Sequence, residues 1–166
     1  MSIYVQYPPS IAAPDFNDWM NKLFMRINDS LSFSVNKNAV NQSTASGVAT
    51  KVEFSTIEYD SSGGYTVSSN KWICQQSGIY EFKCQATLSA TLAVGQTFSL
   101  DIYKNGVLFK HTDIQNVDII NPVLQITAQP KLNKNDYIEV FVTQDIGTQN
   151  ILGAISKTYF YGKRIT

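Results

Sequence analysis

From residue 52 to its end, the chain repeats its apolar residues with a period of two, and this pattern limits the possible folds most strongly. Val52 and Phe54 alternate with polar neighbours such as Glu53, and the later segments keep the alternation. These segments are rich in Val, Ile, Tyr, Phe and Thr, and Gly, Asn, Asp or Pro bounds each of them. Because no helical stretch separates them, the sequence predicts an all-β fold, an antiparallel sandwich or barrel.

Short turn segments join the predicted strands. "KNGV" at 104–107 is a hairpin turn, because Asn and Gly both tolerate the positive φ that a type I′ turn requires. "NKND" at 133–136 is a second turn, and the Gly/Ser cluster at 59–70 is a further break.

The segment "WICQQSGIYEFKC" at 72–84 places two cysteines on either side of a polar break. By alternation, Trp72 shares one strand face with Cys74, and Phe82 shares one with Cys84. Cysteines among aromatic residues on core faces are expected to be two buried free thiols. A disulfide and a two-cysteine metal site are the alternatives.

The first 35 residues differ and are predicted to form an extended arm followed by one amphipathic α-helix. Pro8 and Pro9 favour an extended backbone and exclude a helix before them. Over residues 15–31, apolar side chains recur every three or four positions, as on one face of a helix. An isolated helix of this length is marginal in water, so something must cover its apolar stripe.

Three coverings of this stripe remain open: the chain's own domain, the same helix of two further copies, or another protein. An aromatic stripe beside an extended arm favours the last two and makes this region an attachment device. The residues expected to dock on a partner or to form trimer contacts are Tyr7, Pro8, Pro9, Phe16, Trp19, Met20, Leu23, Phe24 and Ile27. Residues 36–51, small and polar, are predicted to be a linker or a loose first strand, which leaves 52–166 as the β domain.

Charge and hydropathy exclude two classes of partner. Thirteen basic and thirteen acidic residues leave a net charge of zero, which argues against nucleic acid. No stretch approaches the roughly 20 apolar residues of a membrane span, so no membrane insertion is expected. The first residues lack a positively charged start and a continuous apolar core, so a secretory signal is not predicted and we expect assembly in a cytoplasm.

The residues that could carry catalysis or bind metal form no recognisable motif. His111 is the single histidine, and because no Gly-x-Ser-x-Gly elbow accompanies it, an ordinary strand-end histidine is expected. The aspartates lack the spacing of a calcium loop, and no Cys/His cluster has that of a zinc site. We therefore expect no enzyme, no cofactor and no metal.

Tyrosine is frequent in the β region and offers rigid contact area with a polar tip, which suits saccharide or protein recognition. Burial in the core or in a trimer interface is the alternative that aromatic alternation in a sandwich favours. The tyrosines concerned are Tyr59, Tyr65, Tyr103, Tyr137, Tyr159 and Tyr161.

The order of these features resembles the complement C1q / tumour-necrosis-factor (TNF) jelly-roll domain in its phage and bacterial forms, over residues 52–166. "LDIYKNGV" is similar to the family's Leu-x-Lys-Asn-Gly hairpin. "LNKNDYIEVFV" is similar to its Leu-x-x-Gly-Asp-x-Val strand, with Asn135 where Gly is usual. The landmark residues of the core are Trp72, Gly78, Tyr80, Phe82, Phe160 and Gly162.

This resemblance implies a ten-strand antiparallel jelly-roll sandwich in a tight homotrimer, with aromatic residues along the threefold axis and the C-terminal strand near its centre. Animal members carry a collagen stalk, whereas this chain has a Pro-Pro arm and an aromatic helix. That construction resembles a structural protein of the bacteriophage virion, which is therefore its expected location.

Two roles in the virion follow, both with phage proteins as partners. In the first, the trimer is a capsid decoration or cement protein that docks through its N-terminal arm and helix. In the alternative, it is the receptor-binding head of a tail fibre or tail appendage and binds a host surface glycan or protein. A spore-surface or secreted trimeric module is a third hypothesis.

Overall fold

The computed structural model describes residues 31–115 and 118–165, which form one antiparallel β sandwich. The predicted arm and nearly all of the predicted helix, with every docking residue named above, lie outside the described residues. Within those residues the one helical element is a short 3₁₀ turn, η1 (Val67–Ser69). The all-β prediction is therefore confirmed for the described part of the chain.

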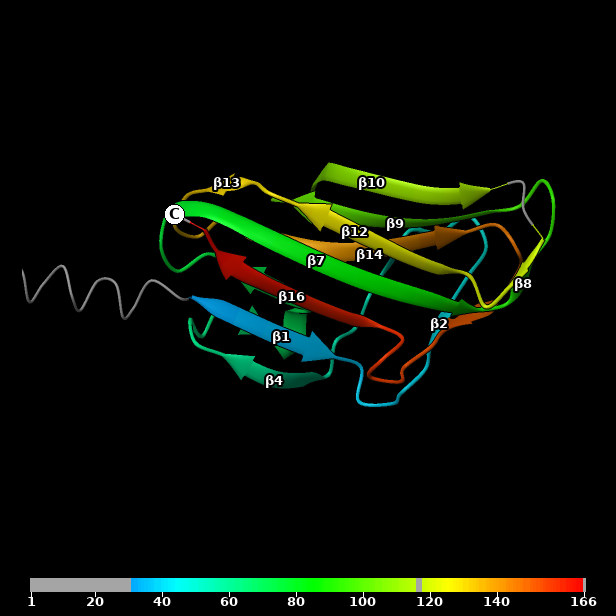
Figure 1. Ribbon diagram of the computed structural model, residues 1–166, viewed down its shortest axis with the longest axis horizontal. Helices are drawn as coiled ribbons and strands as arrows, with labels where there is room; N and C mark the ends of the chain where they lie inside the picture. Colours follow the sequence, from blue (N-terminus) through cyan, green and yellow to red (C-terminus); the bar gives the residue numbers. More distant parts are fainter. Residues whose placement is uncertain (1–30, 116–117, 166) are drawn as a thin grey trace, which may run out of the picture. The chain divides into compact units, whose positions relative to one another are not determined.

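The first sheet has the order β2-β15-β7-β16-β1-β4, and β12 and β13 also pair with β7 (Figure 1). Its strands are β1 (Ser32–Asn36), β2 (Gln42–Thr44), β4 (Thr56–Asp60), β7 (Gly78–Ser89), β12 (Val123–Ala128), β13 (Lys131–Leu132), β15 (Gln149–Ile151) and β16 (Tyr159–Arg164).

The second sheet has the order β10-β9-β14-β6-β5, with β3 also on β14, and β8 and β11 form a separate small pair. These strands are β3 (Thr50–Lys51), β5 (Tyr65–Thr66), β6 (Lys71–Ile73), β8 (Thr91–Leu92), β9 (Thr97–Lys104), β10 (Val107–Gln115), β11 (Ile119–Ile120) and β14 (Tyr137–Gln144).

Strand β7 runs the length of the sandwich and defines its two ends. Its 12 residues span about 40 Å at the rise of an extended strand. At its start, Ile165 donates a backbone hydrogen bond to Ile79, and the neighbouring Arg164 donates one to Leu31. At its other end, Ser89 pairs with Asn150 of β15. The chain therefore enters and leaves the sandwich at one end, and the loops around β8 lie at the other.

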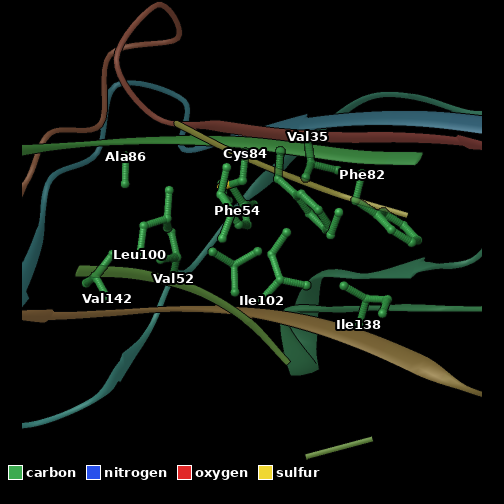
Figure 2. Close-up of a cluster of buried hydrophobic side chains, with 14 of the residues drawn as sticks. Val35, Val52, Phe54, Phe82, Cys84, Ala86, Leu100, Ile102, Ile138 and Val142 are labelled. Carbon is green, nitrogen blue, oxygen red and sulfur yellow. The ribbon is translucent and has the colours of Figure 1, made fainter. Parts of the chain in front are cut away.

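The core between the sheets combines aliphatic side chains with aromatic rings, among them Phe54 and Phe82 (Figure 2). Phe33 of β1 lies 5.5 Å from Trp72 and 5.0 Å from Phe160, measured between ring centroids. Phe82 lies 5.4 Å from Trp72 and 5.8 Å from Phe160. Tyr80 lies 4.9 Å from Trp72 and completes the cluster.

The two landmark glycines have different roles. A Cβ at Gly162 would lie 2.6 Å from Phe82 and 2.7 Å from Phe33, so a glycine is needed where β16 crosses these rings. Gly78 begins β7 and has no positive φ, so its backbone angle does not require a glycine. The polar segment before it turns with ordinary backbone angles.

The predicted tight turns are present. Asn105 and Gly106 have φ values of 53° and 76°, which is the left-handed conformation expected of the hairpin between β9 and β10. Asn135 has a φ of 74°, which accounts for its place where the related pattern has glycine.

Cys74 and Cys84 are free and buried, as expected. Burial raises the pKa of both thiols, which keeps them protonated and chemically quiet.

Residues 36–51, predicted to be a linker or a loose first strand, belong to the compact unit that begins at Leu31, and short strands form in them. β2 and β3 lie in this segment and pair with β15 and β14. Side-chain hydrogen bonds, rather than a regular series of buried apolar residues, hold this segment in place. The buried Lys37 amine donates to the Gln42 side chain at 2.9 Å and to the Glu53 carbonyl at 2.8 Å.

Replacing Phe82 by Ala is expected to destabilise the fold by about 3–5 kcal/mol, because a fully buried aromatic ring is removed and a cavity remains. Tyr80→Ala is expected to cost a similar amount. The measurement is urea unfolding of each variant, with Tyr59→Ala, whose ring is half exposed, as the matched control. Unchanged unfolding midpoints for the two core variants would contradict this packing.

Lys37 makes stability depend on pH in a defined window. Burial lowers the pKa of its amine from 10.5 to about 8, an effect that the nearby Glu53 carboxylate partly offsets. Below pH 8 the amine is charged in both states and the burial cost is complete. Between about pH 8 and 10.5 the native state releases a proton that the unfolded state keeps, so stability rises with pH. The unfolding free energy of the wild type should therefore increase relative to Lys37→Met from pH 7 to pH 10.

Urea unfolding of both proteins at several pH values checks this expectation. Lys157→Met, at an exposed lysine, is the control and should show no such window. A difference between wild type and Lys37→Met that stays constant across the range would contradict the account.

Candidate functional site

The outward face of the first sheet carries a compact group of polar and aromatic side chains, here called the tyrosine face: Lys83, Gln85, Gln125, Thr127, Tyr159 and Tyr161. Strand alternation positions it, because Phe160 points into the core while Tyr159 and Tyr161 point out. The two tyrosine rings stack with 6.2 Å between centroids. A depression of about 280 Å³ lies beside them, between β16 and β12 and over β7.

Gln85 fixes the geometry of this face and is itself nearly buried. Its side-chain oxygen accepts hydrogen bonds from Gln125 at 2.7 Å and from the Tyr159 hydroxyl at 3.3 Å. Its side-chain nitrogen donates to the carbonyls of Ser156 and Lys157 at 2.9 and 3.1 Å. Both ends of the amide are therefore occupied, and the tyrosine face is held in one arrangement before any partner arrives.

Charged side chains lie at one edge of this face. Glu81 lies 3.6 Å from both Lys83 and Lys163. A hydrogen bond from Gln129, assisted by the two lysines, holds the pKa of the Glu81 carboxyl below its usual value. The tyrosine face thus suits a partner surface that is apolar or neutral rather than strongly charged.

The second unusual surface is the start of β10, which forms an edge of the second sheet. Val107, Leu108 and Phe109, here called the apolar edge, are 69%, 50% and 44% exposed. A bulge between Leu108 and Lys110 interrupts the register with β9, and the inward-facing Lys110 hinders unlimited edge pairing. β10 runs near β12 along one side of the sandwich, where both sheets end (Figure 1).

Sequence reasoning missed the apolar edge. Its signal was three consecutive apolar residues after the Asn-Gly turn, which break the alternation of the hairpin strand. An edge strand, open on one side and carrying a run of exposed apolar side chains, favours contact with another chain.

The other candidate residues are distributed over the molecule. Tyr65 is buried and its hydroxyl donates to the Phe54 carbonyl at 3.3 Å, whereas Tyr59 is exposed on β4. Tyr103 and Tyr137 lie on the outward face of the second sheet. The named core landmarks other than Gly78 are all buried. The tyrosines thus divide between the core and both outward faces.

His111 is half exposed on β10 and contacts two carboxylates. Its Nδ1 lies 2.5 Å from Asp101, and its Nε2 lies 3.7 Å from Asp113. This trio contains no nucleophilic hydroxyl or thiol. Among the described residues, no group of three or more His, Cys, Asp or Glu is arranged to hold a metal ion.

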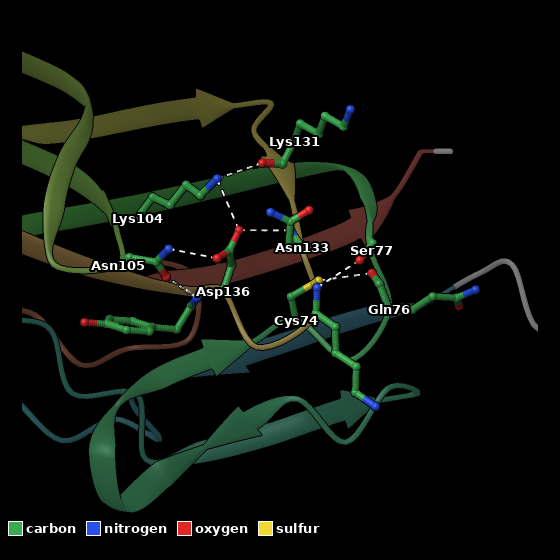
Figure 3. A network of polar contacts seen from close by, with 10 residues as sticks. Cys74, Gln76, Ser77, Lys104, Asn105, Lys131, Asn133 and Asp136 are labelled. Carbon is green, nitrogen blue, oxygen red and sulfur yellow. Dashed lines mark hydrogen bonds and ion pairs between the residues drawn. The ribbon is translucent and has the colours of Figure 1, made fainter.

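A network of polar contacts surrounds Asp136, near the turns at Asn105 and Asn133 (Figure 3). Asp136 accepts hydrogen bonds from the Asn105 side chain at 2.8 Å and from the Asn133 backbone at 2.9 Å, and these bonds lower the pKa of its carboxyl. Lys104 lies 3.2 Å from the same carboxylate. The contacts join the two tight turns, so this cluster holds loops together.

The helices in the part of the chain that is described include none long and apolar enough to cross a bilayer.

Neither the models of known protein families nor the curated proteins contain a match to this sequence. Solved structures do match, at low sequence identity. The globular domain of zebrafish complement 1qA is similar at a TM-score of 0.60, with 15% identity over 82% of this chain and 98% of that chain. Eiger TNF from S. frugiperda has a TM-score of 0.61, with 10% identity over 83% of this chain and 94% of the other.

Murine APRIL at pH 8.0 has a TM-score of 0.63, with 12% identity over 82% of this chain and 98% of that chain. At such identities the likeness concerns the fold alone. The chain therefore has the all-β jelly-roll fold that complement C1q and TNF domains share.

Proposed function

We propose that this chain is a non-enzymatic, homotrimeric structural protein of a bacteriophage virion. In this proposal it is a capsid decoration or cement protein that attaches through the residues preceding its jelly roll. The coexistence of the tyrosine face and the apolar edge on one chain is the observation that carries the assembly part. The virion role rests on the predicted arm and aromatic helix of the first 31 residues.

The two surfaces are different from each other, so their association is heterologous. Contact between the apolar edge of one copy and the tyrosine face of the next repeats around a ring when the rotation closes. The depression is lined by the half-buried rings of Tyr159 and Tyr161. An aromatic side chain such as Phe109 of another copy could pack against these rings. Three copies close the smallest ring, which agrees with the trimer that the family resemblance implies.

The alternative function, a receptor-binding head on the tail, is favoured by one observation at the loop end of the sandwich. Val48 and Val94 lie on loops there and Ile120 lies on β11, and they are 53%, 73% and 74% exposed. Backbone bonds from Gly47 to Gln144 and from Asn121 to Ala90 hold these loops to the strand ends. Because the chain enters at the opposite end, near Leu31, these apolar side chains would point away from the attachment.

Light scattering with size-exclusion chromatography tests the assembly. The wild type is expected to elute at about 55 kDa at micromolar concentration, three times the 18.5 kDa of one chain. Tyr161→Glu should lower the mass to that of one chain, because it places a charge in the contact. Val48→Glu, at an exposed loop, is the matched control and should stay trimeric. A wild-type monomer would overturn the trimer proposal.

Deletion of the gene from a phage that encodes this chain separates the two virion roles. The decoration role predicts particles that adsorb to the host but break more readily on heating, and electron microscopy should locate the chain on the capsid. Intact particles that fail to adsorb would instead support the receptor-binding head. Density on neither capsid nor tail would contradict both.

A further inference from the structure

The outward face of the second sheet lies opposite the tyrosine face and borders the apolar edge, because Leu108 of β10 pairs with Tyr103 of β9. At its centre, Tyr103 of β9 and Phe141 of β14 pack against each other with 4.7 Å between ring centroids. Both rings are partly exposed, although they lie in the middle of a sheet. The two rings are tilted by 52°, and the Lys51 amine of β3 lies over the Phe141 ring, 5.7 Å from its centroid.

Each ring has a carboxylate directly opposite it in the strand register. Asp101 faces Phe141, and Glu139 faces Tyr103, so the four side chains alternate around one patch. The Asp101 and Glu139 side chains are only 9% and 10% exposed. Carboxylates are rarely buried so deeply unless they are paired, and each of these has one partner.

Those partners occupy one oxygen of each carboxylate. Asp101 Oδ1 contacts His111 Nδ1 at 2.5 Å, and Glu139 Oε1 accepts from the Lys51 amine at 2.6 Å. Among the described residues, nothing donates to the remaining oxygens, Asp101 Oδ2 and Glu139 Oε2. Neither oxygen is a buried atom without a hydrogen-bond partner, so both are exposed to solvent beside the rings. The patch therefore offers two fixed acceptors next to an apolar surface.

This combination selects the chemistry of a ligand. An aromatic face attracts polarised C–H groups, and a fixed carboxylate oxygen accepts short, strong hydrogen bonds from hydroxyl groups. Lys51 balances Glu139, whereas Asp101 and Asp113 both contact His111, so the excess of carboxylates disfavours an anionic ligand. A neutral sugar ring has C–H groups on one face and hydroxyl groups around its rim.

We propose that Asp101, Tyr103, Glu139 and Phe141 form a binding platform for a neutral saccharide. The sugar ring lies on the ring of Tyr103, with the tilted Phe141 ring beside it, and its hydroxyl groups donate to Asp101 Oδ2 and Glu139 Oε2. His111 and Lys51 are positioning residues that hold the two carboxylates. The platform is built from β9 and β14 and uses none of the proposed trimer contacts, although Leu108 of the apolar edge lies opposite Tyr103. Glycoside binding and the mass of the assembly are therefore separate readouts.

Saturation-transfer NMR on the full chain tests the proposal, with the methyl glycosides of glucose, galactose, mannose and N-acetylglucosamine as separate probes at millimolar concentration. At least one probe should receive saturation at its ring C–H groups. Tyr103→Ala should weaken its binding roughly tenfold, as the loss of one aromatic contact predicts. Tyr103→Phe should retain binding, since it preserves the ring. Tyr59→Ala removes a tyrosine exposed on the other sheet and should leave binding unchanged.

Asp101→Asn provides the second arm, because it keeps the shape of the side chain and weakens the hydroxyl contact. It should reduce binding while the melting temperature of each variant shows that the fold persists. Absence of saturation transfer to all four glycosides would overturn the proposal. Equal losses in Tyr103→Ala and Tyr59→Ala would overturn it as well, as would binding of N-acetylneuraminic acid as strong as that of the best neutral probe.

Discussion

The packing of Phe82 between Trp72 and Phe160 is the interaction on which the rest of this structure depends. It joins the central strand β7 to its neighbour β16 and to β6 of the opposite sheet. Phe33 adds β1 to the same cluster, at 5.0 Å from Phe160. Because strands alternate, each ring directed into this cluster directs its sequence neighbours outward. The core packing thus decides which side chains form the surfaces.

The tyrosine face is the clearest consequence. Phe160 and Gly162 must both face the rings of the cluster, and only a glycine leaves room at the second position. Tyr159 and Tyr161 are then directed to the outside, where Gln85 and the strands beside it hold them in place. A shift of β16 by one residue would bury the tyrosines and expose Phe160, so the face and the core share one register.

Much of the fold was predictable because local patterns and global packing agree in it. The alternation after residue 52, the Asn105–Gly106 turn and the inward positions of Trp72 and Phe82 are all confirmed. Before residue 52 only a loose first strand was predicted, as an alternative to a linker, since a buried lysine and side-chain amides hold these strands and leave no apolar period. Such contacts join residues far apart in the chain, as the bond from the Gly153 backbone to Asn41 does.

The candidate surfaces were predictable only in part. The outward direction of Tyr159 and Tyr161 can be predicted from the strand alternation. The exposure of Phe109 cannot, because β10 is an edge strand only through the topology of the whole sheet. The pairing of Asp101 with Phe141 depends on the register of β9 against β14. The docking role of the N-terminal residues, the trimer and the place in a virion remain predictions.

The central claim is that the apolar edge of one copy rests on the tyrosine face of the next. Cross-linking with a short bismaleimide tests it most directly, because Cys74 and Cys84 are buried and protonated and do not compete. The account predicts that the double variant Phe109→Cys/Tyr161→Cys forms a covalent trimer, while either single variant alone stays monomeric on a denaturing gel. Cross-linking of a single variant to itself, or none in the double variant, would contradict a heterologous ring.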